Sequence, residues 1–167
     1  MAVKESTSTV EDTSQETKNG KEKTLLVFDL FEEHYAIEVS KIKEIVRIPE
    51  SITRVPNAPA YVCGVINLRG TVIPVMDIAV KMNRGKIERR GESRIVVIEE
   101  EEDIVFGILV DSVREVRTVN VDQIESAESI DSVISKEYLQ GIVRAKDGDL
   151  IVLLDVASIF DIRSYLE

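Results

Sequence analysis

The chain has 167 residues, a formal net charge of −10 and a sequence pI near 4.7. That length predicts one domain or two small ones that share a core, and an acidic surface disfavours nucleic acid and anionic membranes as partners. The single cysteine, Cys63, excludes an internal disulfide framework and a structural zinc cluster, and we interpret it as a small buried hydrophobe. Neither an apolar run of the ~20 residues that span a bilayer nor a signal pattern is found. We therefore expect a soluble cytoplasmic protein without direct membrane insertion.

The predicted elements are short strands separated by brief turns. Residues 1–23 consist mostly of Ser, Thr, Glu and Lys with almost nothing to bury, so we predict that they are disordered. His34 is the one histidine, and at the tip of the first hairpin we interpret it as a solvated turn residue rather than a ligand or base. Runs of aliphatic and aromatic residues predict strands at Thr24–Leu30, Tyr35–Val39, Glu44–Ile48, Thr71–Met76, Arg94–Ile98, Ile104–Val110 and Glu115–Val119.

A linker follows the third of these strands. Ser40–Ile42 predicts a single turn before that strand, and Pro49, Pro56 and Pro59 after it exclude a central strand. Asn57–Val62 is expected to close the linker with a helical turn.

Other segments carry weaker signals. Pro74 removes a ladder donor, so its strand is expected at an edge or a bulge. The polar segment Asn83–Glu92 predicts a boundary between two halves. Five acids at Glu99–Asp103 lack the spacing of a calcium loop, so we interpret them as a solvated turn. Asp122–Ser135 predicts an irregular excursion, and a final helix is expected from Val156 to about residue 165.

Two aspartates occupy matched positions before short helix-like segments. Asp77 precedes IAVKM and Asp155 precedes VASIFDI, and each is suited to accept hydrogen bonds from the first free amides of a helix. The competing hypothesis is a carboxylate pair for acid–base chemistry. We favour the capping role.

The sequence repeats itself. Gly64–Asp77 and Gly141–Asp155 each run from a Gly through a polar turn and an aliphatic strand to an Asp, and Tyr61 and Tyr138 precede them at the same spacing. Upstream, Val39, Ile42, Glu44 and Ile45 align with Val110, Val113, Glu115 and Val116. The duplication predicts an all-β fold with short helices, in which residues 24–83 and 84–167 form two halves related by an approximate two-fold. An exchange of strands between the halves is compatible with this pattern.

Motifs of the common enzyme classes are absent from the sequence. It lacks a phosphate-binding Gly-rich loop followed by Lys, a nucleophile elbow, a Cys–His pair at workable spacing and a zinc signature. We therefore expect no catalytic residues, cofactor or metal, and predict a module that binds other proteins through strand edges and the groove between barrels. The alternative is a small β-barrel enzyme or ligand-binding module with Asp77 or Asp155 as base.

One stretch resembles a known family. The run from Pro59 to Asp77, PAYVCGVINLRGTVIPVMD, is similar to the signature of the CheW-type chemotaxis coupling proteins. Further matches are YAIEVSKIKEI at Tyr35–Ile45, GILVDSVREV at Gly107–Val116 and YLQGI at Tyr138–Ile142. The resemblance covers about residues 24–165. It implies two five-stranded SH3-like β-barrels with a C-terminal helix, and an adaptor that joins the regulatory domain of the histidine kinase CheA to the cytoplasmic helical tip of chemoreceptors.

The resemblance also implies where the two partners bind. For the receptor it implies the turn at Arg69 and the strand at Glu44, brought together by an Arg–carboxylate pair that orients a groove with apolar side chains. The predicted receptor-binding residues are Ile42, Glu44, Ile45, Gly64, Asn67, Arg69 and Gly70. For the kinase it implies barrel edge strands, and the predicted residues are Ile48, Ile52, Arg54 and, in the irregular stretch, Ile130.

Overall fold

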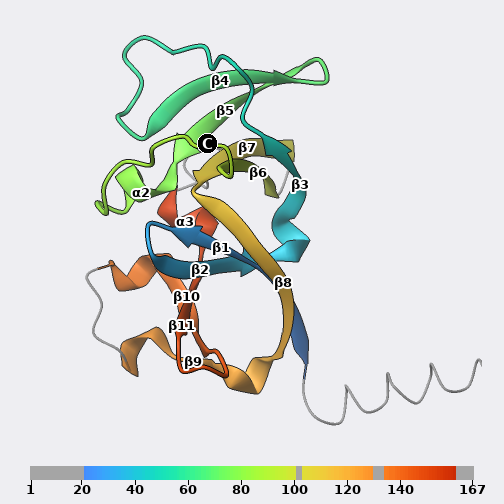
Figure 1. Ribbon diagram of the computed structural model, residues 1–167, viewed down its shortest axis with the longest axis vertical. Coiled ribbons are helices and arrows are strands. Elements are labelled where there is room, and N and C mark those ends of the chain that lie inside the picture. The colour runs from blue at the N-terminus through green and yellow to red at the C-terminus, as the bar shows by residue number, and fades with distance from the viewer. Residues whose placement is uncertain (1–20, 101–102, 130–133, 161–167) are drawn as a thin grey trace, which may run out of the picture.

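The computed structural model describes residues 21–100, 103–129 and 134–160, which form two β-sheets joined by short helical turns (Figure 1). One sheet contains β1 (Glu22–Leu30), β2 (Glu33–Glu38), β8 (Ser112–Asn120), β9 (Ile124–Glu125), β10 (Leu139–Arg144) and β11 (Leu150–Leu154). The other contains β3 (Ile42–Arg47), β4 (Val62–Leu68), β5 (Thr71–Asp77), β6 (Arg94–Glu100) and β7 (Ile104–Val110). The helices are α2 (Ile78–Lys81) and α3 (Val156–Ile159), with 3₁₀ turns η1 (Val39–Lys41), η3 (Val121–Gln123), η4 (Ala127–Ser129) and η5 (Lys136–Tyr138). The predicted all-β class with short helices is confirmed.

Each sheet combines strands from both copies of the repeat. The strand orders are β8-β1-β2-β11-β10-β9 and β3-β6-β7-β5-β4, so the first hairpin of each copy lies in the middle of the other copy's sheet. If each strand is replaced by its counterpart in the other copy of the repeat, the order of the first five strands of the first sheet becomes the strand order of the second sheet. This correspondence is the approximate two-fold relation between the copies. The sheets therefore do not divide at the predicted boundary between residues 83 and 84. The strand exchange is present, because β2 pairs in parallel with β11 and β7 with β5.

The matched Tyr and Asp residues of the repeat have matched backbone contacts. The Asp77 N–H donates to the Tyr61 carbonyl oxygen at 2.7 Å, and the Asp155 N–H donates to the Tyr138 carbonyl oxygen at 2.8 Å. In each copy this bond joins the end of the second hairpin strand to the residue just before the first. The internal repeat read from the sequence is thus a repeat in space.

The core reaches both faces of β1. Leu25 and Val27 belong to a small apolar cluster inside the first sheet, whereas Leu26 and Phe28 belong to a larger cluster that includes side chains of both sheets. Successive side chains of a strand point to opposite faces. Strand β1 is therefore buried on both faces, between the interior of its own sheet and the second sheet.

Each sheet is closed by a crossing segment that passes over a glycine. After β3 the chain reaches Thr53, whose N–H and carbonyl bond to the backbone of Val65 on β4 at 3.0 and 2.8 Å. After β8 the chain reaches β9, which pairs with Ile142 and Val143 of β10. A Cβ on Gly64 would lie 2.3 Å from the Thr53 carbonyl oxygen, and one on Gly141 would lie 2.7 Å from that of Glu125.

Some local predictions require correction. Strand β1 begins at Glu22, so the predicted disorder is wrong for Glu22 and Lys23, which pair with Asn120 and Val119 of β8. Backbone pairing orders these two residues although their side chains bury little surface. Lys21 is also described, and its carbonyl oxygen accepts from the Val121 N–H at 2.8 Å, whereas residues 1–20 lie outside the described part of the chain.

The linker differs from prediction, whereas Pro74 agrees with it. Residues 57–62 form turns without a helix, closed by a bond from the Val62 N–H to the Pro59 carbonyl at 3.0 Å. Strand β5 lies between β4 and β7, but its pairing with β7 begins only at Val75, so at Pro74 the strand is an edge, as predicted. Pro74 is tolerated because it precedes that parallel ladder.

Candidate partner-binding surface

The turn between β4 and β5 presents an arginine to solvent. Leu68 pairs with Thr71, so the turn has two central residues, Arg69 and Gly70, with φ of 54° and 90°. Positive φ at both positions is the requirement of a type I′ hairpin, and Gly meets it without steric cost. The Asn67 carboxamide oxygen fixes the turn by accepting from the Gly70 N–H at 2.8 Å. The Arg69 side chain is 73% exposed at the tip.

An ion pair joins this turn to β3. The Arg69 guanidinium donates from Nη1 to Oε2 of Glu44, a half-buried residue near the middle of β3. Strands β3 and β4 are the two ends of the five-stranded order, so the pair spans the place where the curled sheet brings its edges together. Exposed ion pairs add little net stability. The expected proximity of Arg69 and Glu44 is confirmed, and its consequence is a fixed orientation of the turn against β3.

The two isoleucines of β3 do not lie on one face. Ile42 is half-buried and packs against the larger core cluster, whereas Ile45 is 40% exposed beside exposed Lys43 and Arg47. A register shift between Ile42 and Glu44 leaves Lys43 without a partner on β6. Ile45 thus presents apolar area to solvent, and Ile42 packs beneath the strand.

The sequence reasoning missed Val72. This residue on β5 is 63% exposed and lies directly opposite Asn67, so the two side chains share one face of the hairpin. The aliphatic run that predicted the strand gave no sign that Val72 faces outward. Alternation counted back from buried Val75 and Ile73 would have shown it.

Equivalent exposed aliphatics occur on the other barrel. Val116 of β8 aligns with Ile45 in the repeat and is 62% exposed. Leu150 of β11 stands in the place of Val72 and is also exposed. The two-fold therefore gives each barrel two solvent-facing aliphatic side chains at matched positions.

The other predicted contact residues differ in how far they are exposed to solvent. Gly64 is buried beneath the Thr53 crossing, so it shapes the barrel and offers no surface. Ile48 and Ile52 are half-buried and pack against the larger core cluster, whereas Arg54 is exposed on the linker. Ile130 lies outside the described residues.

His34 is not at the hairpin tip, and its interpretation as a solvated residue is wrong. Leu30 pairs with Glu33, so the turn consists of Phe31 and Glu32 alone and His34 lies within β2. Its Nδ1 lies 2.7 Å from Oδ1 of Asp29, and Nε2 lies 3.6 Å from Oδ2 of Asp149. The imidazole therefore lies between Asp29 of β1 and Asp149 of the loop that precedes β11.

Asp29 is the centre of this polar cluster. Burial raises the pKa of its carboxyl, but hydrogen bonds from His34, Arg114 and Ser112 outweigh burial and hold the pKa below its ordinary value. The carboxylate links β1, β2 and β8 at one end of the first sheet.

Asp77 and Asp155 both cap helices. Asp77 is 3% exposed, and its Oδ1 accepts from the N–H groups of Ala79 and Val80 while its Oδ2 accepts from the Ile87 N–H at 2.9 Å. Burial raises the pKa of the Asp77 carboxyl, and the backbone donors oppose that shift. The Asp155 carboxylate accepts from the backbone and hydroxyl of Ser158. The predicted capping roles are confirmed.

Substituting the two caps should have unequal effects on stability. We expect Asp77→Asn to cost about 1–3 kcal/mol, because the carboxamide nitrogen would face a buried N–H donor. Asp155→Asn should cost about 1 kcal/mol or less, because its site is half-exposed. Urea denaturation of both variants measures the difference. Equal losses would contradict the distinction between the two sites.

Cys63 is half-buried rather than fully buried. Burial raises the pKa of its thiol, and the Asp77 charge acts in the same direction, whereas Arg89 and Lys86 oppose the shift. Within the described residues, no group of three or more His, Cys, Asp or Glu side chains is placed to hold a metal ion. In the same part of the chain, the helices are too short and polar to cross a bilayer.

Comparison with known proteins gives a consistent result. Residues 24–164 match the model of the CheW-like domain. The chain is 35% identical over 149 residues to a chemotaxis protein CheW of Bacillus subtilis (strain 168), covering 89% of this chain and 92% of that protein. It is 33% identical to a chemotaxis protein CheW of Klebsiella aerogenes, covering 78% and 77% of the two chains.

A solved structure shows the same architecture. The crystal structure of the scaffolding protein TtCheW from Thermoanaerobacter tengcongensis aligns with a TM-score of 0.75 and 32% identity, covering 83% of this chain and 87% of that one. The two sheets described above are thus the two SH3-like barrels of that architecture. The chain belongs to the CheW-like family.

Proposed function

We propose that the chain is a non-catalytic cytoplasmic adaptor that couples a CheA-type histidine kinase to the helical tips of chemoreceptors. The family match and the relatives named as chemotaxis and scaffolding proteins support this role. The observation that carries it is the ion pair that holds the exposed Arg69 turn against β3, beside the exposed aliphatic side chain of Ile45. We do not propose the enzyme alternative, since both Asp77 and Asp155 are engaged as helix caps.

The receptor surface proposed here combines a charged turn with aliphatic side chains. A helical tip presents apolar residues along one face, which fit a groove lined by aliphatic groups and oriented by polar contacts. Gly70 gives the turn its conformation, and Ile42 and Gly64 act from within the barrel. The side chains available for contact are Glu44, Ile45, Asn67, Arg69 and Val72.

The proposed kinase surface lies on the linker after β3. Arg54 is its exposed member, and Ile48 and Ile52 hold the linker by packing against the core. Ile130 remains part of this proposal on the family resemblance alone. Two surfaces on different segments allow one adaptor to hold both partners at once.

Reversing the charge of Arg69 should separate receptor binding from folding. We expect Arg69→Glu to weaken binding of a receptor cytoplasmic fragment by about tenfold or more, because the new carboxylate would repel Glu44 and misplace the turn. Binding of the kinase regulatory domain and the circular dichroism melting curve should stay unchanged, since the side chain is largely exposed. Fluorescence anisotropy with labelled fragments measures both affinities.

Arg144→Glu is the matched control. Arg144 also forms an exposed pair with a glutamate, Glu125, at 2.6 Å, but on the other barrel. The Arg144→Glu substitution should leave receptor binding intact. The double reversal Glu44→Arg with Arg69→Glu should recover part of the lost affinity, because it restores the ion pair. Equal losses for Arg69→Glu and Arg144→Glu, or an unfolded Arg69→Glu variant, would contradict the proposal.

A further inference from the structure

Cations gather on the segment that joins α2 to β6. In a chain of net charge −10, residues 81–94 carry only two acids, Glu88 and Glu92. The cations of this segment are Lys81, Arg84, Lys86, Arg89, Arg90 and Arg94. The proposed receptor and kinase surfaces use none of them.

Several of these cations are already engaged within the chain. Arg84 pairs with Glu33, Arg90 with Asp111 at 3.6 Å, Lys81 lies over the Tyr61 ring at 4.8 Å, and Arg94 donates to the Gly91 and Ser93 carbonyls. Lys86 and Arg89, in contrast to the other four cations, are exposed and also form no ion pair with the described residues. Among the residues that the structure describes, no carboxylate lies within ion-pair distance of either. Their charge is therefore available to a partner.

A hollow with apolar walls lies on the linker before β4. Its volume is about 360 Å³ and it is bounded by residues 54–60, 62 and 63. Its apolar lining includes Val55, Pro56, Ala58, Pro59, Val62 and Cys63. Arg54 adds a further exposed cation to its rim, again without an ion pair in the described part of the chain.

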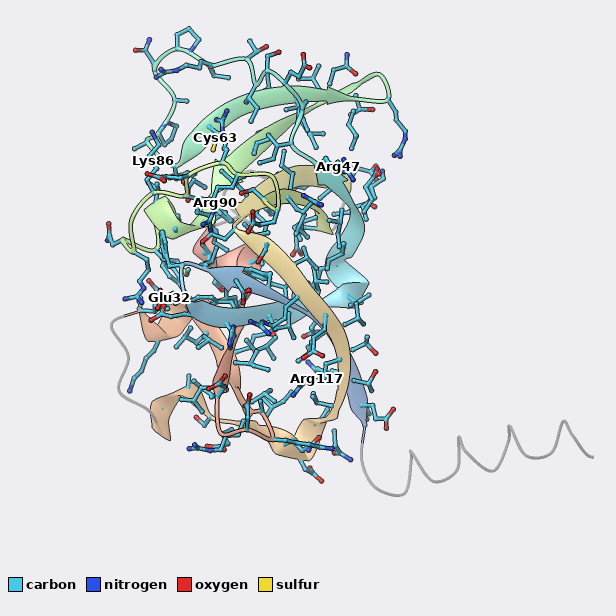
Figure 2. All side chains as sticks on the ribbon, viewed as in Figure 1. Glu32, Arg47, Cys63, Lys86, Arg90 and Arg117 are labelled. Atoms are coloured by element: carbon cyan, nitrogen blue, oxygen red, sulfur yellow. The ribbon has the colours of Figure 1, made fainter. Side chains whose placement is uncertain are left out.

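Cys63 connects the hollow with the cationic segment. Cys63 forms part of the wall; burial raises the pKa of its thiol, and the nearby charges of Arg89 and Lys86 oppose that shift. Figure 2 shows Lys86 beside Cys63 on one flank of the molecule and Arg47 of β3 on the opposite flank. Apolar walls and uncompensated cations thus meet at one place, away from β3.

We propose that this hollow and its cationic rim bind an acidic protein segment that carries an aliphatic side chain. The aliphatic group would enter the hollow, where Val, Pro and Ala side chains replace water around it. Carboxylates flanking it in sequence would reach Arg54, Lys86 and Arg89, where charge complementarity gives specificity. The site shares Arg54 with the proposed kinase surface, whereas Lys86, Arg89 and the apolar lining belong to neither proposed surface, so substitutions at Lys86 and Arg89 test this inference separately.

Nucleic acid fits the site less well. None of the residues that line the hollow is aromatic, so bases would find no ring to stack on. The net charge of −10 also repels a phosphate backbone beyond the immediate patch. A short peptide with a few carboxylates meets the local cations without bringing a long anionic strand close to the rest of the protein.

A nuclear magnetic resonance titration tests the proposal. The probe is a capped hexapeptide, Glu-Asp-Leu-Leu-Asp-Glu, added to the ¹⁵N-labelled full chain. We expect saturable shift changes at amides of residues 54–63 and 84–90, with affinity falling as salt is added. Lys86→Glu combined with Arg89→Glu should weaken binding at least about tenfold. Both side chains are exposed, so the variant's unperturbed spectrum serves as the folding check.

Lys136→Glu is the matched control, because Lys136 is an exposed cation on η5 that belongs neither to the lining of the hollow nor to residues 81–94. It should bind the peptide as the parent chain does. The proposal is overturned by the absence of saturable shifts, by shifts outside these residues, or by equal binding of the Gln-Asn-Leu-Leu-Asn-Gln peptide. Tighter binding of a thymidine octanucleotide at the same residues would likewise overturn it in favour of a phosphate site.

Discussion

Gly64→Ala is expected to destabilise the fold by about 3 kcal/mol or more, which places it among the most damaging single substitutions in this chain. The added Cβ would lie 2.3 Å from the Thr53 carbonyl oxygen and 2.7 Å from Cγ2 of Ile52. Both distances are shorter than side chains tolerate, and the first involves backbone that cannot rotate away. The φ of +149° adds strain for any residue with a Cβ.

The cost arises because Thr53 closes the barrel. Its N–H and carbonyl form both backbone bonds between the linker and Val65 of β4. Relieving the clash would move the linker away and break both bonds at the edge of the sheet. Gly141 is under the same constraint, since a Cβ there would lie 2.5 Å from Cγ2 of Ile124. We therefore expect Gly141→Ala to be comparably damaging.

Urea denaturation followed by circular dichroism measures these losses, with Gly91→Ala as the control. A Cβ on Gly91 would meet no heavy atom within 4 Å, and its φ lies outside the left-handed region. That substitution should change stability by a few tenths of a kcal/mol at most. A Gly64→Ala variant as stable as Gly91→Ala would show that the crossing does not hold the barrel together.

Much of this architecture was predictable from local pattern. The order of Tyr61, Gly64 and Asp77 recurs at Tyr138, Gly141 and Asp155 with a turn one residue longer, and the structure gives each pair similar contacts. Asp capping depends on a few neighbouring amides, so it can be read from a short stretch of sequence.

The strand exchange was not predictable in the same way. A strand such as β1 shows the same apolar pattern whichever copy's sheet it joins, so its sequence does not specify its neighbours. Burial on both faces, which Leu25 and Leu26 report, is equally compatible with either arrangement. The exchange is specified by pairing over long sequence separations, including the parallel ladder between His34 and Ile151.

The candidate site was predictable in part. The polar turn Arg69–Gly70 and the acid of β3 stood out because both interrupt apolar runs. The different environments of Ile42 and Ile45 were also predictable, because residues three apart on a strand point to opposite faces and the burial of β3 alternates regularly. His34 was misplaced because a two-residue turn and a four-residue turn look alike in an acidic stretch.

Separating the chain between Gly91 and Glu92 should leave neither part able to fold alone. The C-terminal part lacks β1 and β2, which occupy the middle of the first sheet between β8 and β11. The N-terminal part lacks β6 and β7, the corresponding pair of the second sheet. Each loss uncovers strands that are buried on both faces, such as β1 and β6. The free energy lost by exposing them exceeds the unfolding free energy of about 5–15 kcal/mol that is typical of a domain.

The break point lies in an exposed part of the connecting loop. Gly91 is exposed, whereas Ile87 is buried and donates to Asp77, so a cut after residue 91 keeps that contact within the N-terminal part. We expect each purified fragment to show no cooperative melting transition by circular dichroism. Mixing the two should restore it, together with a single species of the intact mass by size-exclusion chromatography.

A chain carrying a protease site at the same position provides the control. Once cleaved in the folded state it should keep its spectrum, because the cut interrupts no strand and the pairings of β1 with β8, β2 with β11, β3 with β6 and β5 with β7 still join the two parts. If the fragment 92–167 alone melted cooperatively, its barrel would not need the hairpin of the other repeat. The exchange of hairpins would then be a detail of packing, and the two barrels would be independent folding units.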